Sequence, residues 1–173
     1  VTSAKVANAR AVLQRAARDH GDRMVLELIQ TVVERLANIL RDLQQPISID
    51  RVRGLEGDAA RAYFVAFDEL ILQQKTDFFF HERSRRPPRD NMNALLSFLY
   101  ALLANDVTAA CESVGLDPQM GFLHNDRAGR PSLALDLLEE FRAMLADRLA
   151  LSLVNRQQVS AKGFLRSETG GVE

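Results

Sequence analysis

Apolar side chains recur along most of this 173-residue chain at the three- and four-residue spacing that places them on one face of an α-helix. The clearest stripe consists of Val25, Leu28, Ile29, Val32, Val33, Leu36, Ile39, Leu40 and Leu43. Pro46 follows it, and proline does not continue a helix. An alanine-rich stretch precedes it and ends at Gly21. The pattern therefore predicts two helices, Thr2–His20 and Asp22–Gln45.

The middle of the chain predicts two more helices separated by an irregular segment. A third helix is expected from Ile47 to about Gln74. Residues Lys75–Asp90 contain two adjacent prolines and show no helical period. The fourth helix, Asn91–Val114, is apolar almost all round, which is typical of a central helix. Gly115 supplies its end.

After a loop, Pro131 suits the first position of a fifth helix that extends to about Asn155. The only candidate for a strand is Ala150–Val159. The fold class is therefore all-α, a helical bundle over residues 1–159, and residues 160–173 are expected to form a mobile tail.

Composition limits the class of protein without choosing one. Apolar residues make up 47% of the chain and charged residues 26%, which favours a folded core over disorder. The formal net charge of −1 means that any surface that binds nucleic acid must be local. Cys111 is the single cysteine and lies in an apolar run, so it is interpreted as a core residue in a reducing, cytoplasmic compartment. With no run of 18 apolar residues, no membrane span is predicted. The start at Val1 falls inside a helical pattern, which indicates a chain cut from a longer one.

Three segments hold candidate chemistry, and each signal alone is weak. Glu56 borders a face of small residues between two glycines of the predicted third helix, but a solvated helix acid would look the same. His124 stands in the loop before the fifth helix, where a histidine is more often an ordinary polar residue. Asp136 and Glu139 share one helix face, yet acids near a helix N-terminus also complement the helix dipole.

Four arginines lie within seven residues of the irregular segment, and Pro87 and Pro88 stiffen it. Such guanidinium groups would be suited to DNA phosphates, and the alternative is a solvated charged loop. The residues proposed to contact DNA are Arg85, Arg86 and Arg89. Tyr63 and Tyr100 have apolar neighbours and are interpreted as core residues first.

The order and the residues of these segments resemble the Cas-one family of CRISPR-associated adaptation nucleases and integrases. The matching motifs are Lys5-x-x-Asn8-x-Arg10, Gly54-Leu55-Glu56-Gly57, Arg85-Arg86-Pro87-Pro88-Arg89-Asp90, Gly121-Phe122-Leu123-His124 and Ser132-Leu133-Ala134-Leu135-Asp136-Leu137-Leu138-Glu139. The segment Asp68–Lys75 with Phe78-Phe79-Phe80 is most similar to members from subtype I-C systems. The resemblance covers about residues 3–164.

The resemblance implies a helical catalytic domain that follows a β-rich N-terminal domain, and the latter is absent from this chain. It implies Mg²⁺ or Mn²⁺ held by Glu56, His124 and Glu139, with Asp136 as an alternative ligand or a supporting residue. Two carboxylates and an imidazole suit these ions better than a structural Zn²⁺ site does. Many members carry aspartate where this chain has Glu139, so the metal position shifts slightly.

The implied reaction is phosphodiester hydrolysis, or transesterification by a DNA 3′-hydroxyl during spacer integration. The implied partners are DNA, a second copy in the full-length protein and the small Cas-two protein, in the prokaryotic cytoplasm. The fragment alone is expected to integrate nothing. The alternative from the residues alone is a non-catalytic helical DNA-binding or assembly module. A helical ligand-binding regulator would need a large apolar cavity.

Overall fold

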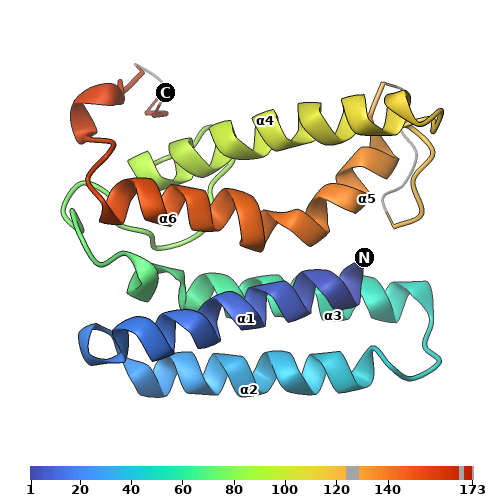
Figure 1. Cartoon of the computed structure of the whole chain (residues 1–173), viewed down its shortest axis with the longest axis horizontal. Helices are drawn as coiled ribbons and strands as arrows, with labels where there is room; N and C mark the ends of the chain where they lie inside the picture. Colours follow the sequence, from blue (N-terminus) through green and yellow to red (C-terminus); the bar gives the residue numbers. More distant parts are fainter. Residues whose placement is uncertain (124–128, 168–169, 173) are drawn as a thin grey trace.

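The computed structural model describes residues 1–123, 129–167 and 170–172, which form two packed layers of helices (Figure 1). The first layer contains α1 (Thr2–His20), α2 (Leu26–Asp42) and α3 (Ile49–Val65). The second contains α4 (Asn91–Ser113), α5 (Ser132–Phe141) and α6 (Arg148–Asn155). α1 contacts α2 and α3 in its own layer and α5 in the other. The all-α prediction is confirmed, and the described residues contain no strand beyond one isolated bridge.

The first two helices follow the apolar stripes that predicted them. α1 has the predicted bounds, and it buries Val6, Val12 and Leu13 against the rest of the bundle. α2 begins four residues later than expected, because a 3₁₀ turn, η1 (Gly21–Arg23), takes up the residues after Gly21. Its stripe reaches the core through Ile29, Val32, Leu36 and Ile39.

The third helix is shorter than predicted. α3 begins after Ser48, whose hydroxyl accepts a hydrogen bond from the Arg51 amide, and it ends at Val65 rather than near Gln74. A 3₁₀ turn, η2 (Phe67–Leu70), and an extended segment follow. Both place apolar side chains in the core, as a helix would. The apolar pattern therefore continues beyond the end of α3, which is why a longer helix was predicted.

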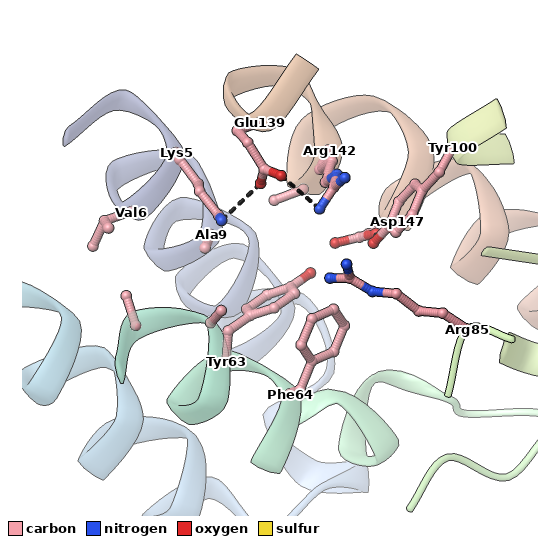
Figure 2. Close-up of a pocket in the computed structure, with 13 residues that line it drawn as sticks. Lys5, Val6, Ala9, Tyr63, Phe64, Arg85, Tyr100, Glu139, Arg142 and Asp147 are labelled. Carbon is pink, nitrogen blue, oxygen red and sulfur yellow. Dashed lines mark hydrogen bonds and ion pairs between the residues drawn. The ribbon is translucent and has the colours of Figure 1, made fainter. Parts of the chain in front are cut away.

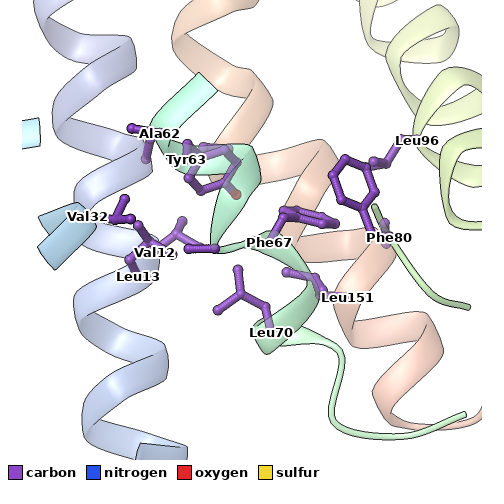
Figure 3. Close-up of a cluster of buried hydrophobic side chains, with 14 of the residues drawn as sticks. Val12, Leu13, Val32, Ala62, Tyr63, Phe67, Leu70, Phe80, Leu96 and Leu151 are labelled. Carbon is purple, nitrogen blue, oxygen red and sulfur yellow. The ribbon is translucent and has the colours of Figure 1, made fainter. Parts of the chain in front are cut away.

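An aromatic cluster joins this turn to the irregular segment (Figure 3). The rings of Phe64 and Phe67 lie 5.4 and 4.8 Å from that of Phe80, between centroids, in the range of favourable aromatic pairs. Phe78 is also fully buried. Residues Lys75–Asp90 are irregular as predicted, but the side chains of Phe78 and Phe80 belong to the core.

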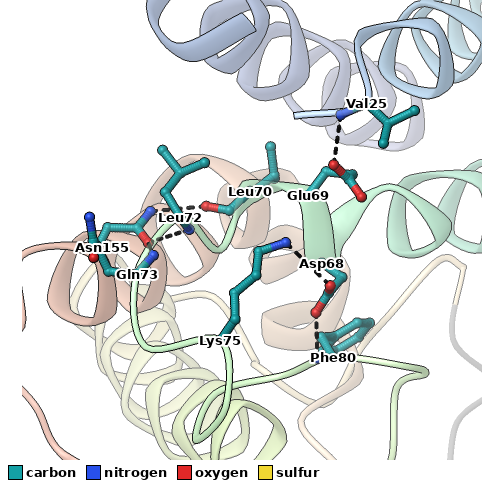
Figure 4. Close-up of polar contacts among 9 residues, drawn as sticks. All are labelled: Val25, Asp68, Glu69, Leu70, Leu72, Gln73, Lys75, Phe80 and Asn155. Atoms are coloured by element: carbon teal, nitrogen blue, oxygen red, sulfur yellow. Dashed lines mark hydrogen bonds and ion pairs between the residues drawn. The ribbon is translucent and has the colours of Figure 1, made fainter. Parts of the chain in front are cut away.

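Polar contacts hold the segment between η2 and α4 (Figure 4). The Asn155 side chain accepts from the amides of Leu72 and Gln73 and donates to the carbonyl of Leu70. Asp68 accepts the amide of Phe80 at 2.8 Å. These bonds satisfy backbone groups that no helix or strand would satisfy.

α4 is capped at both ends as its sequence indicates. Asp90 accepts the amide of Asn93 at 2.7 Å, and Gly115 has a φ of +78°, the left-handed conformation that favours glycine after a helix. By length and composition alone, α4 could cross a membrane. A core helix of a soluble protein passes the same test, and α4 contacts α5 and α6. Only 33% of its apolar stretch is buried, and Phe98 and Leu102 are exposed, so the central position predicted for this helix is wrong.

The predicted fifth helix is three elements. α5 leads into one wide π-helical turn, η3 (Arg142–Asp147), and α6 continues to Asn155. Pro131 immediately precedes α5 instead of occupying its first turn. The strand considered at Ala150–Val159 was wrong, because α6 occupies most of that range.

Described residues of the C-terminal segment contact the arginine-bearing loop. Val172 is buried, and its amide donates to the carbonyl of Pro88 at 2.8 Å. Arg166 and Val172 form the isolated antiparallel bridge. The mobility expected of residues 160–173 stays a prediction.

Candidate functional site

Glu56 and Glu139, two of the three predicted metal ligands, meet at one lysine. The Lys5 ammonium on α1 lies 2.6 Å from Glu56 Oε1, on α3, and 2.7 Å from Glu139 Oε2, on α5. Because both oxygens contact the same nitrogen atom, they are at most 5.3 Å apart. The structure therefore brings together two acids that are far apart in the sequence.

α1 fixes this geometry because it packs on both helices that carry the acids. The Asn8 side chain, one turn after Lys5, donates to the carbonyl of Glu140 at 2.8 Å. This bond ties α1 to the C-terminal half of α5, beside Glu139. Lys5, which contacts both acids, and Asn8, which donates to α5, therefore lie on one face of α1.

The third predicted ligand, His124, lies outside the described residues. The chain just before it is held from two sides. Asp136 Oδ2 accepts the amides of Phe122 at 2.6 Å and Leu123 at 2.9 Å. Arg53, on α3 near Glu56, donates to the Leu123 carbonyl at 3.1 Å. These contacts fix the backbone up to residue 123 between α3 and α5.

Asp136 had two predicted roles, as an alternative ligand or as support for the ligands. It is 2% exposed, and its carboxylate is engaged by the backbone of the loop. These contacts favour the supporting role. A ligand role for Asp136 stays a prediction.

The chemistry of Glu139 fits a bound cation. The side chain is buried, and Oε2 contacts the Lys5 ammonium at 2.7 Å. A buried carboxylate is costly unless a cation compensates it, and in this structure that cation is Lys5. The described residues contain no group of three His, Cys, Asp or Glu side chains placed for a metal. The two acids therefore supply only part of a coordination shell, of a kind that hard cations prefer.

Glu139 also joins a buried polar network that the sequence did not reveal. Arg142 contacts Glu139 Oε1 at 2.7 Å, and its guanidinium carbon lies 4.8 Å from the centre of the Tyr100 ring. The Tyr100 hydroxyl donates to Asp147 Oδ1 at 2.5 Å. Arg83 also contacts the Tyr100 ring, at 5.3 Å. The network thus links α4, α5 and the wide turn η3.

Burial dominates the electrostatics of this network. It raises the pKa of Asp147 to about 6, although hydrogen bonding from Tyr100 and the nearby Arg142 oppose the shift. Burial and the Asp147 charge also raise the pKa of Tyr63 and of Tyr100 well above the ordinary value. Both tyrosines are therefore neutral hydroxyl groups at any physiological pH.

These groups surround a small pocket between the layers (Figure 2). The pocket has a volume of about 60 Å³, which is too small for a nucleotide. Lys5, Glu139 and Arg142 line one side, and the hydroxyl of Tyr63 points into it. The large apolar cavity that a ligand-binding regulator would need does not occur at this place.

A larger, more basic pocket of about 620 Å³ lies next to it and shares three residues, Arg85, Glu139 and Arg142. Arg86 and Arg130 add two further guanidinium groups to its lining. Two of the three predicted DNA-contacting arginines, Arg85 and Arg86, thus lie beside the acids. Arg89 is exposed and is not among the residues that line this pocket.

Sequence reasoning missed the roles of Lys5, Arg142 and Asp147. Lys5 belonged to a matching motif, but a lysine between two carboxylates is visible only once the helices pack. Asp147 did carry a signal, because it lies in the apolar run that buries α6. An acid within such a run requires partners.

Comparison with known proteins extends these observations to the whole chain. The family model described as CRISPR associated protein Cas1 matches residues 1–173. A CRISPR-associated endonuclease Cas1 from Rhodospirillum rubrum is 56% identical over 172 residues, covering 97% of this chain and 50% of the relative. The chain spans about half the length of several curated relatives that it matches.

Two solved structures share the fold. A casposase bound to its integration product aligns with a TM-score of 0.75 and 27% identity, over 99% of this chain and 47% of the casposase chain. A chain of a partial Cas6-RT-Cas1–Cas2 complex aligns with a TM-score of 0.80 and 25% identity, over 99% of this chain and 50% of the other. Each of these two solved chains therefore shares its fold with 99% of this chain.

Proposed function

The chain belongs to the CRISPR-associated Cas1 family, and from this premise we propose that it is the helical catalytic part of a DNA endonuclease and integrase of spacer acquisition. The observation that carries the proposal is the convergence of Glu56 and Glu139 on one cation position, beside a pocket of arginines. Acids that hold a cation next to phosphate-binding groups are what phosphodiester chemistry requires.

We propose that Glu56, Glu139 and His124 hold Mg²⁺ or Mn²⁺. When bound, such an ion polarises the phosphodiester and activates a water or a DNA 3′-hydroxyl. Lys5 occupies the position between the two acids, so it would have to move for an ion to bind there, and its ammonium could then contact a phosphate.

The test of the metal centre is Mn²⁺ binding and DNA cleavage by the Glu56→Gln and Glu139→Gln variants. Each substitution removes one anionic ligand and keeps the size of the side chain, so both variants should lose Mn²⁺ binding and cleavage. Asp58→Asn, an acid on α3 that pairs with Arg35, is the matched control. Unchanged Mn²⁺ binding in both glutamine variants would contradict the metal centre and favour a non-catalytic DNA-binding or assembly module.

We propose that Arg85, Arg86 and Arg89 bind the phosphates of the DNA. Arg85 and Arg86 do so in the basic pocket, together with Arg130 and Arg142, and Arg89 does so on the exposed surface nearby. Each lost duplex contact should reduce the slope of log affinity against log salt by roughly 0.9.

The experiment compares DNA binding of the chain and a triple alanine variant of Arg85, Arg86 and Arg89 over a range of salt concentrations. The control replaces three exposed arginines of α1 and η1 that do not line the basic pocket, Arg15, Arg18 and Arg23. The first variant should bind unrelated sequences more weakly and show a flatter slope. Equal slopes for the two variants would mean that the segment is a solvated loop.

The remaining proposals concern the whole protein. The casposase neighbour is bound to an integration product, and another neighbour belongs to a Cas1–Cas2 complex. We therefore propose that the full-length protein integrates DNA as a homodimer with a small Cas2 partner in the cytoplasm. The subtype I-C assignment stays a prediction.

A further inference from the structure

The wide turn η3 changes which residues share a side of the chain. Residues five apart in an α-helix point about 140° away from each other, because each residue turns the helix by about 100°. A π-helical turn closes hydrogen bonds between residues five apart and so brings them towards one side. Arg142 and Asp147 are the first and last residues of η3, and both line the small pocket. Both also reach Tyr100.

Tyr100 is therefore fixed from several directions. Asp147 accepts a hydrogen bond from its hydroxyl, and the guanidinium groups of Arg142 and Arg83 contact its ring. Arg83 is itself held by α4, since it donates to Asn93 at 2.7 Å and to Ser97 at 3.0 Å. These contacts hold the ring of Tyr100 against Arg142.

Arg142 carries this rigidity to Glu139. One guanidinium nitrogen contacts Glu139 Oε1 at 2.7 Å, which leaves Oε2 turned towards Lys5 and Glu56. The orientation of the carboxylate thus depends on Arg142, and that of Arg142 on Tyr100.

We propose that Asp147, Tyr100 and Arg142 are positioning residues that aim Glu139 Oε2 at the metal position. This inference rests on the proposed metal centre. It assigns a purpose to the π-helical turn, which would otherwise be an unfavourable interruption of the α5–α6 helix. Groups that orient metal ligands in this way typically contribute 10- to 100-fold to metal affinity.

The test is Mn²⁺ affinity, measured by calorimetry on the purified 173-residue chain and on the Tyr100→Phe, Asp147→Asn and Arg142→Gln variants. Tyr100→Phe keeps the ring and removes only the bond to Asp147. We expect each variant to bind Mn²⁺ roughly 10- to 100-fold more weakly. Arg142→Lys should recover part of the loss, because its ammonium can still pair with Glu139.

A double substitution separates positioning from mere stabilisation. If Tyr100 acts through Arg142, then Tyr100→Phe should add little to the loss already caused by Arg142→Gln. Independent structural damage would instead give losses that add in free energy. Arg148→Gln, next to Asp147 but exposed and outside the network, should bind Mn²⁺ as the unchanged chain does.

Failure of this inference differs from failure of the metal centre. If Glu56→Gln and Glu139→Gln lose Mn²⁺ while folded Tyr100→Phe and Arg142→Gln bind it normally, the positioning role is wrong and the centre stands. If the two glutamate variants also bind normally, the centre itself is wrong. Should Asp147→Asn fail to fold, Tyr100→Phe and Arg142→Lys still decide the question.

Discussion

At the scale of single residues, Lys5 compensates two neighbouring acids, half-buried Glu56 and buried Glu139, in the absence of a metal. Its side chain is only 17% exposed and that of Glu139 only 6%, so water screens neither charge well. Removing one partner of a buried ion pair leaves the other charge uncompensated. Lys5 is thus a resident cation, and a divalent ion in the proposed centre would have to displace it.

We therefore expect Lys5→Gln to destabilise the metal-free chain, by about 3 kcal/mol. Mn²⁺ should restore more stability to this variant than to the unchanged chain, because no ammonium competes for the carboxylates. Thermal unfolding with and without Mn²⁺ measures both effects. Arg35→Gln, which breaks an exposed ion pair with Asp58, is the control and should cost less than about 1 kcal/mol. Equal melting temperatures for Lys5→Gln and the control without metal would contradict the argument.

Asp147 gives a second expectation at this scale, for the dependence of stability on pH. Its pKa is about 6 in the folded chain against 3.8 for the ordinary carboxyl, so the folded state binds the extra proton between these values. Stability from this group is fully present below pH 3.8 and is lost as pH rises through about 6. The total is ~3 kcal/mol.

The measurement is urea unfolding of the chain and of Asp147→Asn between pH 4 and pH 7. The variant lacks this one titration, so the difference in unfolding free energy cancels the other carboxyl groups. The unchanged chain should lose ~3 kcal/mol relative to the variant as pH rises. A difference that stays constant with pH would show that Asp147 titrates as an ordinary carboxyl.

Much of the site was predictable at the residue scale, and its supporting network was not. Glu56 and Glu139 were singled out because the residues around each of them match sequence motifs of the family. Lys5 and Arg142 lie within or next to such motifs, but their roles depend on which side chains of other helices they contact. Contacts between side chains of different helices arise from packing, which the apolar periodicity of a single segment does not encode.

At the scale of elements, the approach of Gly121 to α5 is the tightest contact near the site. A Cβ atom at Gly121 would lie 2.6 Å from Ser132 Cβ and 2.8 Å from the Ser132 carbonyl carbon, which is closer than atoms pack. Backbone would have to move. The backbone amides of the next two residues, Phe122 and Leu123, donate hydrogen bonds to Asp136.

Gly121→Ala should therefore destabilise the chain by about 1–3 kcal/mol and weaken Mn²⁺ binding, because it displaces the loop that leads to residue 124. Gly163→Ala is the control, since nothing lies within 4 Å of a Cβ there. Chemical denaturation and calorimetry give the two readouts. Full stability with normal Mn²⁺ binding in Gly121→Ala would mean that the loop accommodates the methyl group.

Element types were predicted better than element ends. Helix Thr2–His20 was predicted to the residue, because its apolar stripe and Gly21 agree. The end of α3 was missed because Phe67, Leu70 and Ile71 fill the core from a 3₁₀ turn and an extended segment. The wide turn η3 was missed because one extra residue per turn hardly alters an apolar pattern over six residues.

At the scale of the whole molecule, the C-terminal segment and the arginine loop form one unit in the structure. The Val172 amide bonds to the Pro88 carbonyl, and a Cβ at Gly171 would collide with the Pro87 side chain. Such close contact between segments that are far apart in sequence stiffens both of them. The sequence showed only a short polar tail, because the partner of Val172 lies 84 positions earlier.

We expect hydrogen exchange to show a protected amide at Val172. Deleting residues 164–173 should then raise exchange in residues 83–89, because the loop loses its cover. Mass spectrometry of the matching peptides measures both. A Val172 amide that exchanges as fast as in an unfolded peptide would support the mobile tail expected from the sequence.

The pairing of Lys5 and Arg142 with Glu56 and Glu139 makes the centre electroneutral without metal, with two positive and two negative side chains. A divalent ion then adds two positive charges that no described acid of this group balances. A phosphodiester supplies the missing anion, so metal and DNA should bind cooperatively. Because such linkage is reciprocal, DNA should tighten metal binding by the same factor by which metal tightens DNA binding. In the proposed centre, the resident lysine would thereby couple the affinity for metal to the affinity for DNA.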